Sequence, residues 1–287
     1  MDSMYKILDG RAIAQKIKNR LKKKVQASKL RPGLAVVFAG SDPASLSYIR
    51  AKERAAQEID VQFFFYKLPS KSLTKHIVAL IEELNQRKDV HGVIVQLPLP
   101  KHLNRSHILN AIALEKDVDV LSDQAKKLFE NGRPVFVPPP ASAAMELIKQ
   151  SGKRAEQSVV TLVGHGILVG KPIETLLSQK AKTLFVCDQK TQLLSTKTRK
   201  ADILISAVGK PNLITASMVK KGAVLIDAGT SRHQGKIVGD VDFDRVAPKT
   251  SFITPVPGGV GPVTVAMLIA NVVKAALSNS KKFLRLD

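Results

Sequence analysis

The sequence describes a globular and strongly basic chain. It has 287 residues, of which 44% are hydrophobic, and a formal net charge of +21 from 45 Lys and Arg against 24 Asp and Glu. This length suffices for two domains with sizeable cores. The single cysteine, Cys187, excludes a disulfide framework and favours a reducing, cytoplasmic compartment. The six histidines show no metal-ligand spacing, so no metal is expected.

Neither a membrane nor a nucleic acid is the expected partner. The N-terminus lacks a basic segment followed by an apolar run, and we expect no stretch with the roughly 18 to 20 apolar residues of a membrane span. The positive charge attracts anions in general. Because aromatic residues make up only 5% of the chain, stacking platforms for nucleic acid are scarce, and solvated basic faces are the favoured interpretation.

The first half of the chain alternates helices and strands. A helix opens at Asp9-Gly10 with an apolar stripe at Ile13, Ile17, Leu21 and Val25. The predicted elements after it are a strand at 34–39, a helix at 44–58, a strand at 61–66, a helix at 73–85, a strand at 92–96 and a short helical segment at 106–113. This alternation indicates parallel βαβ units. The proline-rich residues 134–140 predict a stiff connection between two domains.

A second α/β unit follows the connection. The strand predicted at 158–163 runs directly into Gly164-His-Gly-Ile-Leu-Val-Gly170, and Lys171-Pro172 opens a helix that ends near residue 180. Glycines between a strand and a helix let the backbone approach a pyrophosphate, as in dinucleotide sites. The third glycine falls one residue late for G-x-G-x-x-G, so a plain turn stays open. Further strands at 183–187, 202–208 and 223–228 complete a Rossmann-like order.

The loop Thr254-Pro-Val-Pro-Gly-Gly-Val-Gly-Pro-Val-Thr264 offers a rigid backbone surface for a ligand. Its glycines carry no Cβ, its prolines stiffen the turns, and Pro262 opens a terminal helix. The free N–H groups of that helix face the loop. A plain connection before a terminal helix is the alternative interpretation.

These motifs resemble those of the bifunctional methylenetetrahydrofolate dehydrogenase/methenyltetrahydrofolate cyclohydrolase family, nearly from end to end. The matching segments are Asp9-Gly10, Gly40-Ser-Asp-Pro-Ala-Ser45 with Tyr48 and Lys52, Val95-Gln-Leu-Pro-Leu-Pro100, Lys116-Asp-Val-Asp119, the Gly164–Pro172 turn, Val238-Gly-Asp240 and the 254–264 loop. The resemblance implies two α/β domains facing a cleft. Residues 1–140, completed by the helix at 262–287, would bind folate, and residues 141–261 would form the Rossmann-like dinucleotide domain.

The resemblance also implies the reactions and the residues that perform them. Methylenetetrahydrofolate would be oxidised with NADP, and the methenyl product hydrolysed to 10-formyltetrahydrofolate, in the one-carbon metabolism that supplies purine biosynthesis. Lys52 would be the catalytic lysine, assisted by Tyr48 and Gln96. Tyr48, Asp119, Pro257, Gly258 and Gly259 would bind the substrate, and the enzyme would be a homodimer.

From the residues alone, Tyr48 and Lys52 lie four positions apart on one helix face, which is often only a solvated face. Gln96 is equally typical of a strand-end cap and Asp119 of a loop or helix cap.

The expected cofactor-binding residues surround the glycine turn. They are Gly164, His165, Gly166, Val169, Gly170, Asp188 and Thr230. An acidic residue about 20 positions beyond the glycines bonds the ribose 2′-OH in Rossmann sites and repels a 2′-phosphate. Asp188 therefore leaves NAD possible beside the NADP that the family implies. Alternatively, Asp188 only caps a helix that begins near Thr191.

Departures from the family pattern cluster around the expected folate site. Val120 and Leu121 replace the usual Gly-Phe after Asp119, Ala125 and Lys127 replace a usual Asn and Gly, and Pro138-Pro-Pro-Ala141 replaces a Pro-Cys-Thr-Pro segment. On the cofactor side, His165-Gly166 and Asp188-Gln189 replace the usual Arg-Ser and His-Ser. Three hypotheses follow: a working bifunctional enzyme, a degenerate homologue with weak or single activity, and a nucleic-acid-binding module. We favour the first.

Overall fold

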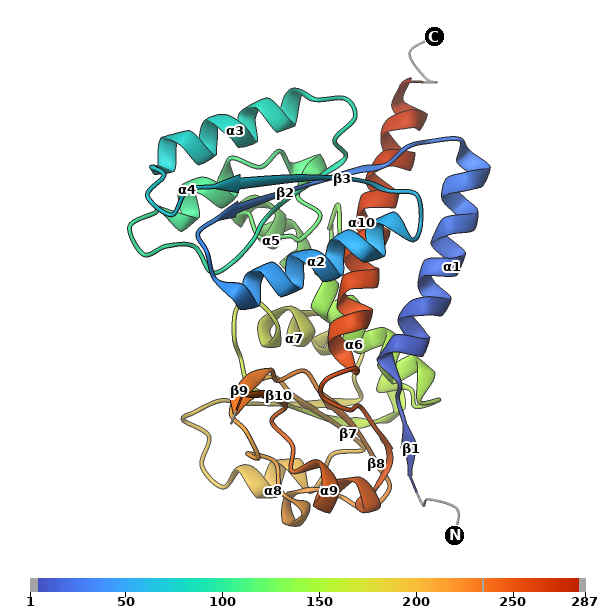
Figure 1. Ribbon diagram of the computed structural model, residues 1–287. Helices are drawn as coiled ribbons and strands as arrows, with labels where there is room; N and C mark the ends of the chain where they lie inside the picture. The colour runs from blue at the N-terminus through green and yellow to red at the C-terminus, as the bar shows by residue number, and fades with distance from the viewer. Residues whose placement is uncertain (1–4, 234, 284–287) are drawn as a thin grey trace. The chain divides into compact units, whose positions relative to one another are not determined.

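The computed structural model describes residues 5–233 and 235–283 and consists of two compact units (Figure 1). The first, here the Lys52 unit, comprises residues 15–139 and 265–287. The second, here the Gly164 unit, comprises residues 1–14 and 140–264. Both units have a parallel α/β fold, which confirms the predicted fold class.

The Lys52 unit is built on a parallel sheet of three strands in the order β3-β2-β4. The strands are β2 (Gly33–Ala39), β3 (Gln62–Leu68) and β4 (Gly92–Val95), close to the predicted positions. Every residue of β2 and β4 is buried, because helices cover both faces of a parallel sheet. In register, Val37 of β2 lies between Tyr66 and Val95.

The helices of this unit pack on the two faces of that sheet. They are α2 (Pro43–Gln57), α3 (Thr74–Gln86), α4 (Arg105–Asn110) and α5 (Asp123–Glu130), with a 3₁₀ turn η1 at Leu114–Lys116. Ile77 and Ile81 of α3 and Ile108 of α4 form one apolar cluster with strand residues such as Val37 and Val93. Figure 1 shows α2 on the opposite face from α3. Helix α5 was not predicted.

Two long helices, α1 (Gly10–Ser28) and α10 (Val260–Phe283), each have their first residues in the Gly164 unit and the rest in the Lys52 unit. In α1, the predicted stripe Ile13, Ile17, Leu21 and Val25 is buried. The last helix, α10, starts at the 254–264 loop, as expected.

Residues Val260–Ser278 of α10 are long and apolar enough to cross a membrane, so our expectation that no such stretch exists was wrong. Half of this stretch is buried inside the protein, and a core helix is apolar on most sides for that reason.

The Gly164 unit is built on six parallel strands in the order β1-β11-β8-β7-β5-β6. The predicted strands are β5 (Val159–Val163), β6 (Thr183–Cys187), β7 (Ile203–Ser206) and β8 (Ala223–Asp227). Two strands of this sheet, β1 (Lys6–Ile7) at its edge and β11 (Thr250–Ile253) beside it, and the hairpin β9 (Ser231–His233) and β10 (Lys236–Val238) were not predicted. All are too short for a periodic signal.

The helices of this unit are α6 (Pro139–Gln150), α7 (Gly170–Ser178), α8 (Leu194–Thr198) and α9 (Phe243–Val246), with 3₁₀ turns at Ala155–Gln157, Ala216–Met218 and Ala247–Lys249. Two predictions need correction. Pro139 and Pro140 do not continue a connector but open α6, where proline fits because first-turn N–H groups need no intrahelical partner. The helix expected near Thr191 begins at Leu194, after Leu193 in a left-handed conformation.

Candidate functional site

The side chain of Lys52 lies on the inner face of α2. The helix is fixed at its start by Asp42, whose carboxylate accepts hydrogen bonds of 2.7 Å from both the backbone N–H and the hydroxyl of Ser45. Ile49 and Ala56, one turn before and one turn after Lys52, are buried. The lysine therefore shares the face that packs against the sheet, and the solvated-face interpretation does not hold for it.

Gln96 directly follows β4 and accepts a hydrogen bond from Lys52. Lys52 Nζ donates a hydrogen bond of 2.8 Å to Gln96 Oε1, and Gln96 Nε2 donates one of 2.7 Å to the carbonyl of Leu97. Gln96 is 7% exposed. Because the Leu97 carbonyl holds the side-chain amide of Gln96, the Oε1 atom of Gln96 points at the amine of Lys52. Gln96 is therefore more than a strand-end cap.

Lys52 and Asp119 are coupled electrostatically. Burial lowers the pKa of Lys52, and the negative charge of Asp119 opposes this change. Burial raises the pKa of Asp119, against the positive charge of Lys52 and with a further contribution from Asp117. Burial thus disfavours the charged form of each group. An amine with a lowered pKa transfers protons more readily near neutral pH.

The segment that carries Asp119 is fastened by its neighbours. The side chain of Lys116 is buried, and its Nζ donates to the carbonyls of Leu84, Asn85 and Arg87 at 3.0, 2.8 and 2.7 Å. These carbonyls belong to the C-terminal end of α3, where a cation is favoured. Sequence reasoning missed this role of Lys116, because nothing in the motif distinguishes a capping lysine from an exposed one.

Val120 next to Asp119 has an unusual backbone. Its φ is +58°, in the left-handed region that β-branched residues rarely adopt. The buried carboxylate of Asp117 holds this turn by accepting from the backbone N–H groups of Leu121 at 3.1 Å and Ser122 at 2.8 Å. The glycine that the family pattern usually has here would take this conformation without strain.

Tyr48 lies one turn before Lys52 on α2 and is 46% exposed. Its ring is therefore available to a ligand in the Lys52 unit.

In the Gly164 unit, the predicted glycine turn follows β5. Gly164 has a φ of +101°, and a Cβ on it would lie 2.4 Å from the carbonyl oxygen of Ala207, just beyond β7. Only glycine fits there. Strand β5 lies between β6 and β7. The chain leaves β5 towards β6 on one side and leaves β7 towards β8 on the other side, so the connections after these two neighbouring strands run in opposite directions. In open parallel sheets, ligands bind at the carboxyl ends of strands at such a switch point.

The turn brings the expected cofactor residues to the start of α7. A Cβ on Gly170 would lie 2.1 Å from the Gly164 carbonyl oxygen, so the turn closes tightly on itself. Val169 directly precedes the helix, whose first N–H groups are suited to a phosphate. His165 pairs with Glu174 of α7. A Cβ on Gly166 would meet nothing within 4 Å, so this position is open.

Asp188 and Thr230 follow two strands of the same sheet, β6 and β8, which are separated by β5 and β7. Asp188 directly follows β6, beside the turn, since the Gly164 N–H donates to the Cys187 carbonyl at 2.8 Å. Asp188 Oδ1 accepts from the Lys190 N–H at 2.9 Å and from the Thr191 hydroxyl at 3.1 Å. It thus stabilises a local turn and caps no helix. Thr230 follows β8, with its carbonyl oxygen 3.9 Å from the Cβ position of Gly209.

The 254–264 loop packs on the beginning of α1. A Cβ on Gly10 would lie 1.7 Å from the Gly259 carbonyl oxygen, and one on Gly259 would lie 2.6 Å from that of Pro255. Close packing therefore explains these two glycines without a ligand. Gly258, with a φ of +112°, lies beside Arg11.

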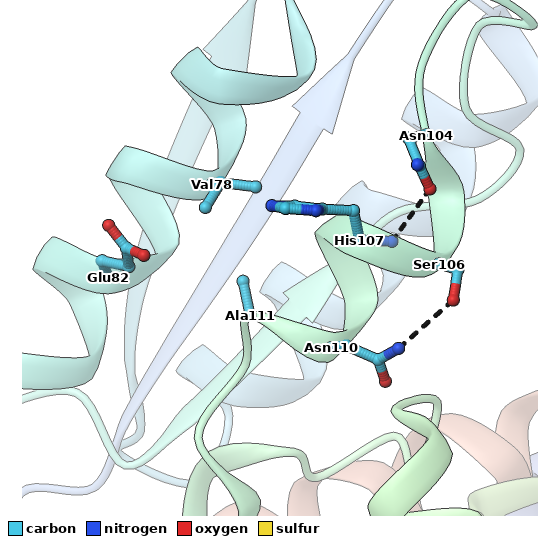
Figure 2. A pocket seen from close by; sticks show the side chains of 7 residues that line it. All are labelled: Val78, Glu82, Asn104, Ser106, His107, Asn110 and Ala111. Carbon is cyan, nitrogen blue, oxygen red and sulfur yellow. Dashed lines mark hydrogen bonds between the residues drawn. The ribbon is translucent and has the colours of Figure 1, made fainter.

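A separate pocket of about 460 Å³ lies between α3 and α4 (Figure 2) and contains none of the expected site residues. Among its polar groups, Asn104 Oδ1 accepts from the His107 N–H, and Asn110 donates to Ser106 and to Asp123. No group of three His, Cys, Asp or Glu suited to a metal ion occurs within the described ranges 5–233 and 235–283.

Comparison with known proteins identifies the family. The model for the tetrahydrofolate dehydrogenase/cyclohydrolase catalytic domain matches residues 8–119, and that for the NAD(P)-binding domain matches residues 138–280. The bifunctional protein FolD of Exiguobacterium sibiricum is 44% identical over 276 residues, covering 95% of this chain and 100% of that protein.

Solved structures agree with this. FolD from Campylobacter jejuni has a TM-score of 0.92 at 40% identity, covering 96% of this chain and 99% of that chain. The Trypanosoma brucei enzyme, solved with NADP and an inhibitor, has a TM-score of 0.91 at 34% identity, covering 96% and 98%. The chain therefore belongs to the tetrahydrofolate dehydrogenase/cyclohydrolase family of bifunctional enzymes.

Proposed function

We propose that this enzyme oxidises 5,10-methylenetetrahydrofolate with NADP and hydrolyses the resulting 5,10-methenyltetrahydrofolate to 10-formyltetrahydrofolate, with Lys52 as its principal catalytic group. The observation that carries the proposal is the Lys52–Gln96 hydrogen bond of 2.8 Å in a setting where burial lowers the pKa of the lysine. A lysine so held, in a chain of this family, is suited to proton transfer near neutral pH.

Hydrolysis assigns a role to each group around Lys52. Water adds to the methenyl carbon and loses a proton, which the neutral amine of Lys52 accepts, and the ammonium then returns it to the ring nitrogen as the C–N bond breaks. Gln96 orients the amine through its Oε1. Asp119 anchors the pterin ring, Tyr48 lies against the substrate, and Pro257, Gly258 and Gly259 complete the substrate contacts.

Oxidation requires chiefly that the donor carbon be held against the cofactor. The nicotinamide, when bound, accepts the hydride. Gly164, His165, Gly166, Val169, Gly170, Asp188 and Thr230 are the residues proposed to hold the dinucleotide. Support comes from the tight turn at the switch point of the sheet and from the α7 N–H groups that follow it.

NADP is the proposed cofactor, as in the Trypanosoma brucei relative, and NAD remains the second candidate because of Asp188. The carboxylate of Asp188 already accepts two hydrogen bonds. These bonds lower the pKa of Asp188, so its charge is kept at neutral pH and opposes a 2′-phosphate.

The remaining assignments are also proposals. Folate binding is assigned to residues 1–140 with 262–287, and dinucleotide binding to residues 141–261. We further propose a cytoplasmic homodimer that supplies one-carbon units to purine biosynthesis.

A degenerate enzyme with one weak activity is the alternative. Two observations favour it: the strained Val120 beside Asp119, and Pro139 and Pro140, which replace polar residues of the family pattern.

The decisive experiment assays both reactions on the purified chain, with NADP and with NAD in turn. Growth of absorbance from reduced nicotinamide with methylenetetrahydrofolate, and decay of methenyltetrahydrofolate faster than the uncatalysed rate, are the expected results. Loss of either activity in a folded protein supports the degenerate enzyme instead.

A further inference from the structure

Two buried aspartates lie at the carboxyl end of the Gly164 unit's sheet, outside the residues expected to bind the cofactor. Asp227 is the last residue of β8 and is 3% exposed. Asp240 follows β10, belongs to the Val238-Gly-Asp240 motif and is 0% exposed. Neither has a role in the function proposed above.

Asp240 fixes the loop after β7. Its Oδ2 accepts from the Ser206 hydroxyl at 2.7 Å and the Val208 N–H at 2.8 Å, and its Oδ1 accepts from the Lys210 N–H at 2.8 Å. Hydrogen bonds to a carboxylate are about twice as strong as neutral ones. The loop at 207–210, which borders Gly164, is therefore held by one side chain.

Asp227 joins the next two segments to this loop. Its carboxylate accepts from the N–H groups of Gly229 at 2.9 Å, Asp240 at 3.1 Å and Val241 at 3.0 Å. Its own N–H donates to the Thr254 hydroxyl at 2.7 Å, at the start of the 254–264 loop. Segments after β7, β8, β10 and β11 are thus connected through the two aspartates.

The arrangement leaves no room for adjustment. A Cβ on Gly229 would lie 2.1 Å from Asp240 Oδ1, and one on Gly239 would lie 2.0 Å from Asp227 Oδ2. The backbone of each loop therefore lies directly against a carboxylate, and a shift of either carboxylate moves the loop.

Stability alone does not explain two neighbouring buried acids. Buried charges lose their hydration, and like charges repel, so apolar residues are often the more stabilising choice. Burial and the charge of Asp240 raise the pKa of Asp227 to about 6, despite the three donors around it. What the pair provides is a defined loop shape.

We propose that Asp227 and Asp240 are positioning residues of the dinucleotide site: they hold the loops at 207–210 and 228–230 in the shape that receives the cofactor. This inference rests on the proposed function of the Gly164 unit. Thr230, proposed to contact the cofactor, directly follows Gly229, so its position is set by the pair.

The two activities of the enzyme separate this role from general stabilisation. Oxidation consumes a dinucleotide, whereas hydrolysis of methenyltetrahydrofolate consumes none and is assigned to Lys52 in the other unit. A residue that only stabilises the fold affects both. A residue that shapes the dinucleotide loops raises the KM for NADP and spares hydrolysis.

The test uses Asp240→Asn. The NH₂ group of the asparagine replaces one carboxylate oxygen and then faces either the Ser206 and Val208 donors or the Lys210 donor, from which it cannot accept a hydrogen bond. With that hydrogen bond lost, we expect the KM for NADP to rise about tenfold or more, because hydrogen bonds to a charged group are stronger than neutral ones and their loss frees the loop. Hydrolysis should stay within about twofold of wild type. Asp244→Asn, an exposed aspartate four residues later, makes the same charge change and should alter neither.

Ser206→Ala is the milder variant, for the case that Asp240→Asn does not fold. It removes one donor to Asp240 and should raise the KM for NADP about threefold to tenfold. An unchanged KM in the folded variants, or an equal loss of both activities, overturns the proposal.

Direct binding distinguishes failure of this proposal from failure of the proposed function. NADPH fluorescence measures a Kd without turnover, and the chain contains no tryptophan to interfere. If wild type turns over nothing but binds NADPH, a weaker Kd in Asp240→Asn still supports the positioning role, and an unchanged Kd overturns it.

Discussion

The two candidate sites differ in the atoms that form them. Around Lys52, side chains from separate elements converge: an amine from α2, an amide after β4 and a carboxylate after η1. Around Gly164, the surface is backbone, made possible by absent side chains. The first site should therefore be sensitive to the removal of a functional group, and the second to the addition of a single carbon.

The largest effect is expected from Lys52→Met. Since proton transfer by a positioned group contributes roughly 10²- to 10⁴-fold, hydrolysis should fall by about that factor while folate binding persists. A stopped-flow assay of methenyltetrahydrofolate decay measures it. Lys75→Met, an exposed lysine on α3, is the matched control. Retained hydrolysis in Lys52→Met refutes the assigned role.

A pH-dependent effect is expected at Asp227. The pKa of this group is about 6 in the folded protein against 3.8 ordinarily, a difference worth roughly 3 kcal/mol. The folded state binds the proton first as the pH falls, so this contribution to stability is complete below about 4 and is lost as the pH rises through 6.

Denaturant unfolding of wild type and Asp227→Asn between pH 4 and 8 measures this contribution. The free energy of unfolding of wild type should decline relative to the variant as the pH rises from about 4 to about 6, and the difference should stay level above that. Parallel pH curves contradict the raised pKa.

Gly164→Ala tests the backbone site. The added Cβ would lie 2.4 Å from the Ala207 carbonyl oxygen at a φ of +101°. We expect the Kd for NADPH to rise about 10- to 100-fold, since a strained conformation costs roughly 1–3 kcal/mol. Hydrolysis should persist. Gly222→Ala, in the same unit at a φ of +77° and with nothing within 4 Å of its Cβ, is the matched control, and equal effects of the two variants would show that crowding is not the cause.

A smaller effect is expected from Asp188→Ser. Removal of the negative charge should shift the ratio of kcat/KM for NADP over NAD upward by about tenfold, or 1.4 kcal/mol. Thr191→Ala removes a partner of Asp188 and keeps the charge, so it separates turn shape from electrostatics. An unchanged ratio in Asp188→Ser would show that Asp188 does not face the ribose.

The smallest effect is expected from Val120→Gly. Release of the left-handed backbone gains roughly 1–2 kcal/mol. Val120 is only 3% exposed, however, and deletion of its buried side chain costs roughly 1.5–3 kcal/mol, to which the entropy of glycine in the unfolded chain adds, so the free energy of unfolding should fall by about 1 kcal/mol. Lys29→Gly, at a φ of +54° outside the site, is the control. A lowered KM for folate in Val120→Gly alone would show that strain also displaces Asp119.

The sequence was most informative where chemistry and periodicity coincide. The buried strands β2, β4, β5, β7 and β8 and the half-buried β6 were predicted because their apolar runs are continuous. Gly164 and Lys52 were found through their motifs. The short strands β1 and β11 were missed because two to four residues carry no period.

Roles that depend on distant partners were also missed. Nothing within Lys116-Asp-Val-Asp119 shows that Lys116 contacts the end of α3, some 30 positions away in the chain. The same is true of Asp240 and Ser206. Such partners are defined only once the chain is folded.

The interleaving of the two units has a consequence for synthesis on the ribosome. Residues 15–139 of the Lys52 unit are translated before residues 140–264 of the Gly164 unit, and residues 265–287 of the Lys52 unit are translated after them. Asn271, in that last segment, donates to the carbonyls of Val118 and Val137 at 2.8 and 2.9 Å. Nascent chains must therefore hold an incomplete core of the Lys52 unit while residues 140–264 are translated, and neither unit is encoded by one uninterrupted stretch of the gene.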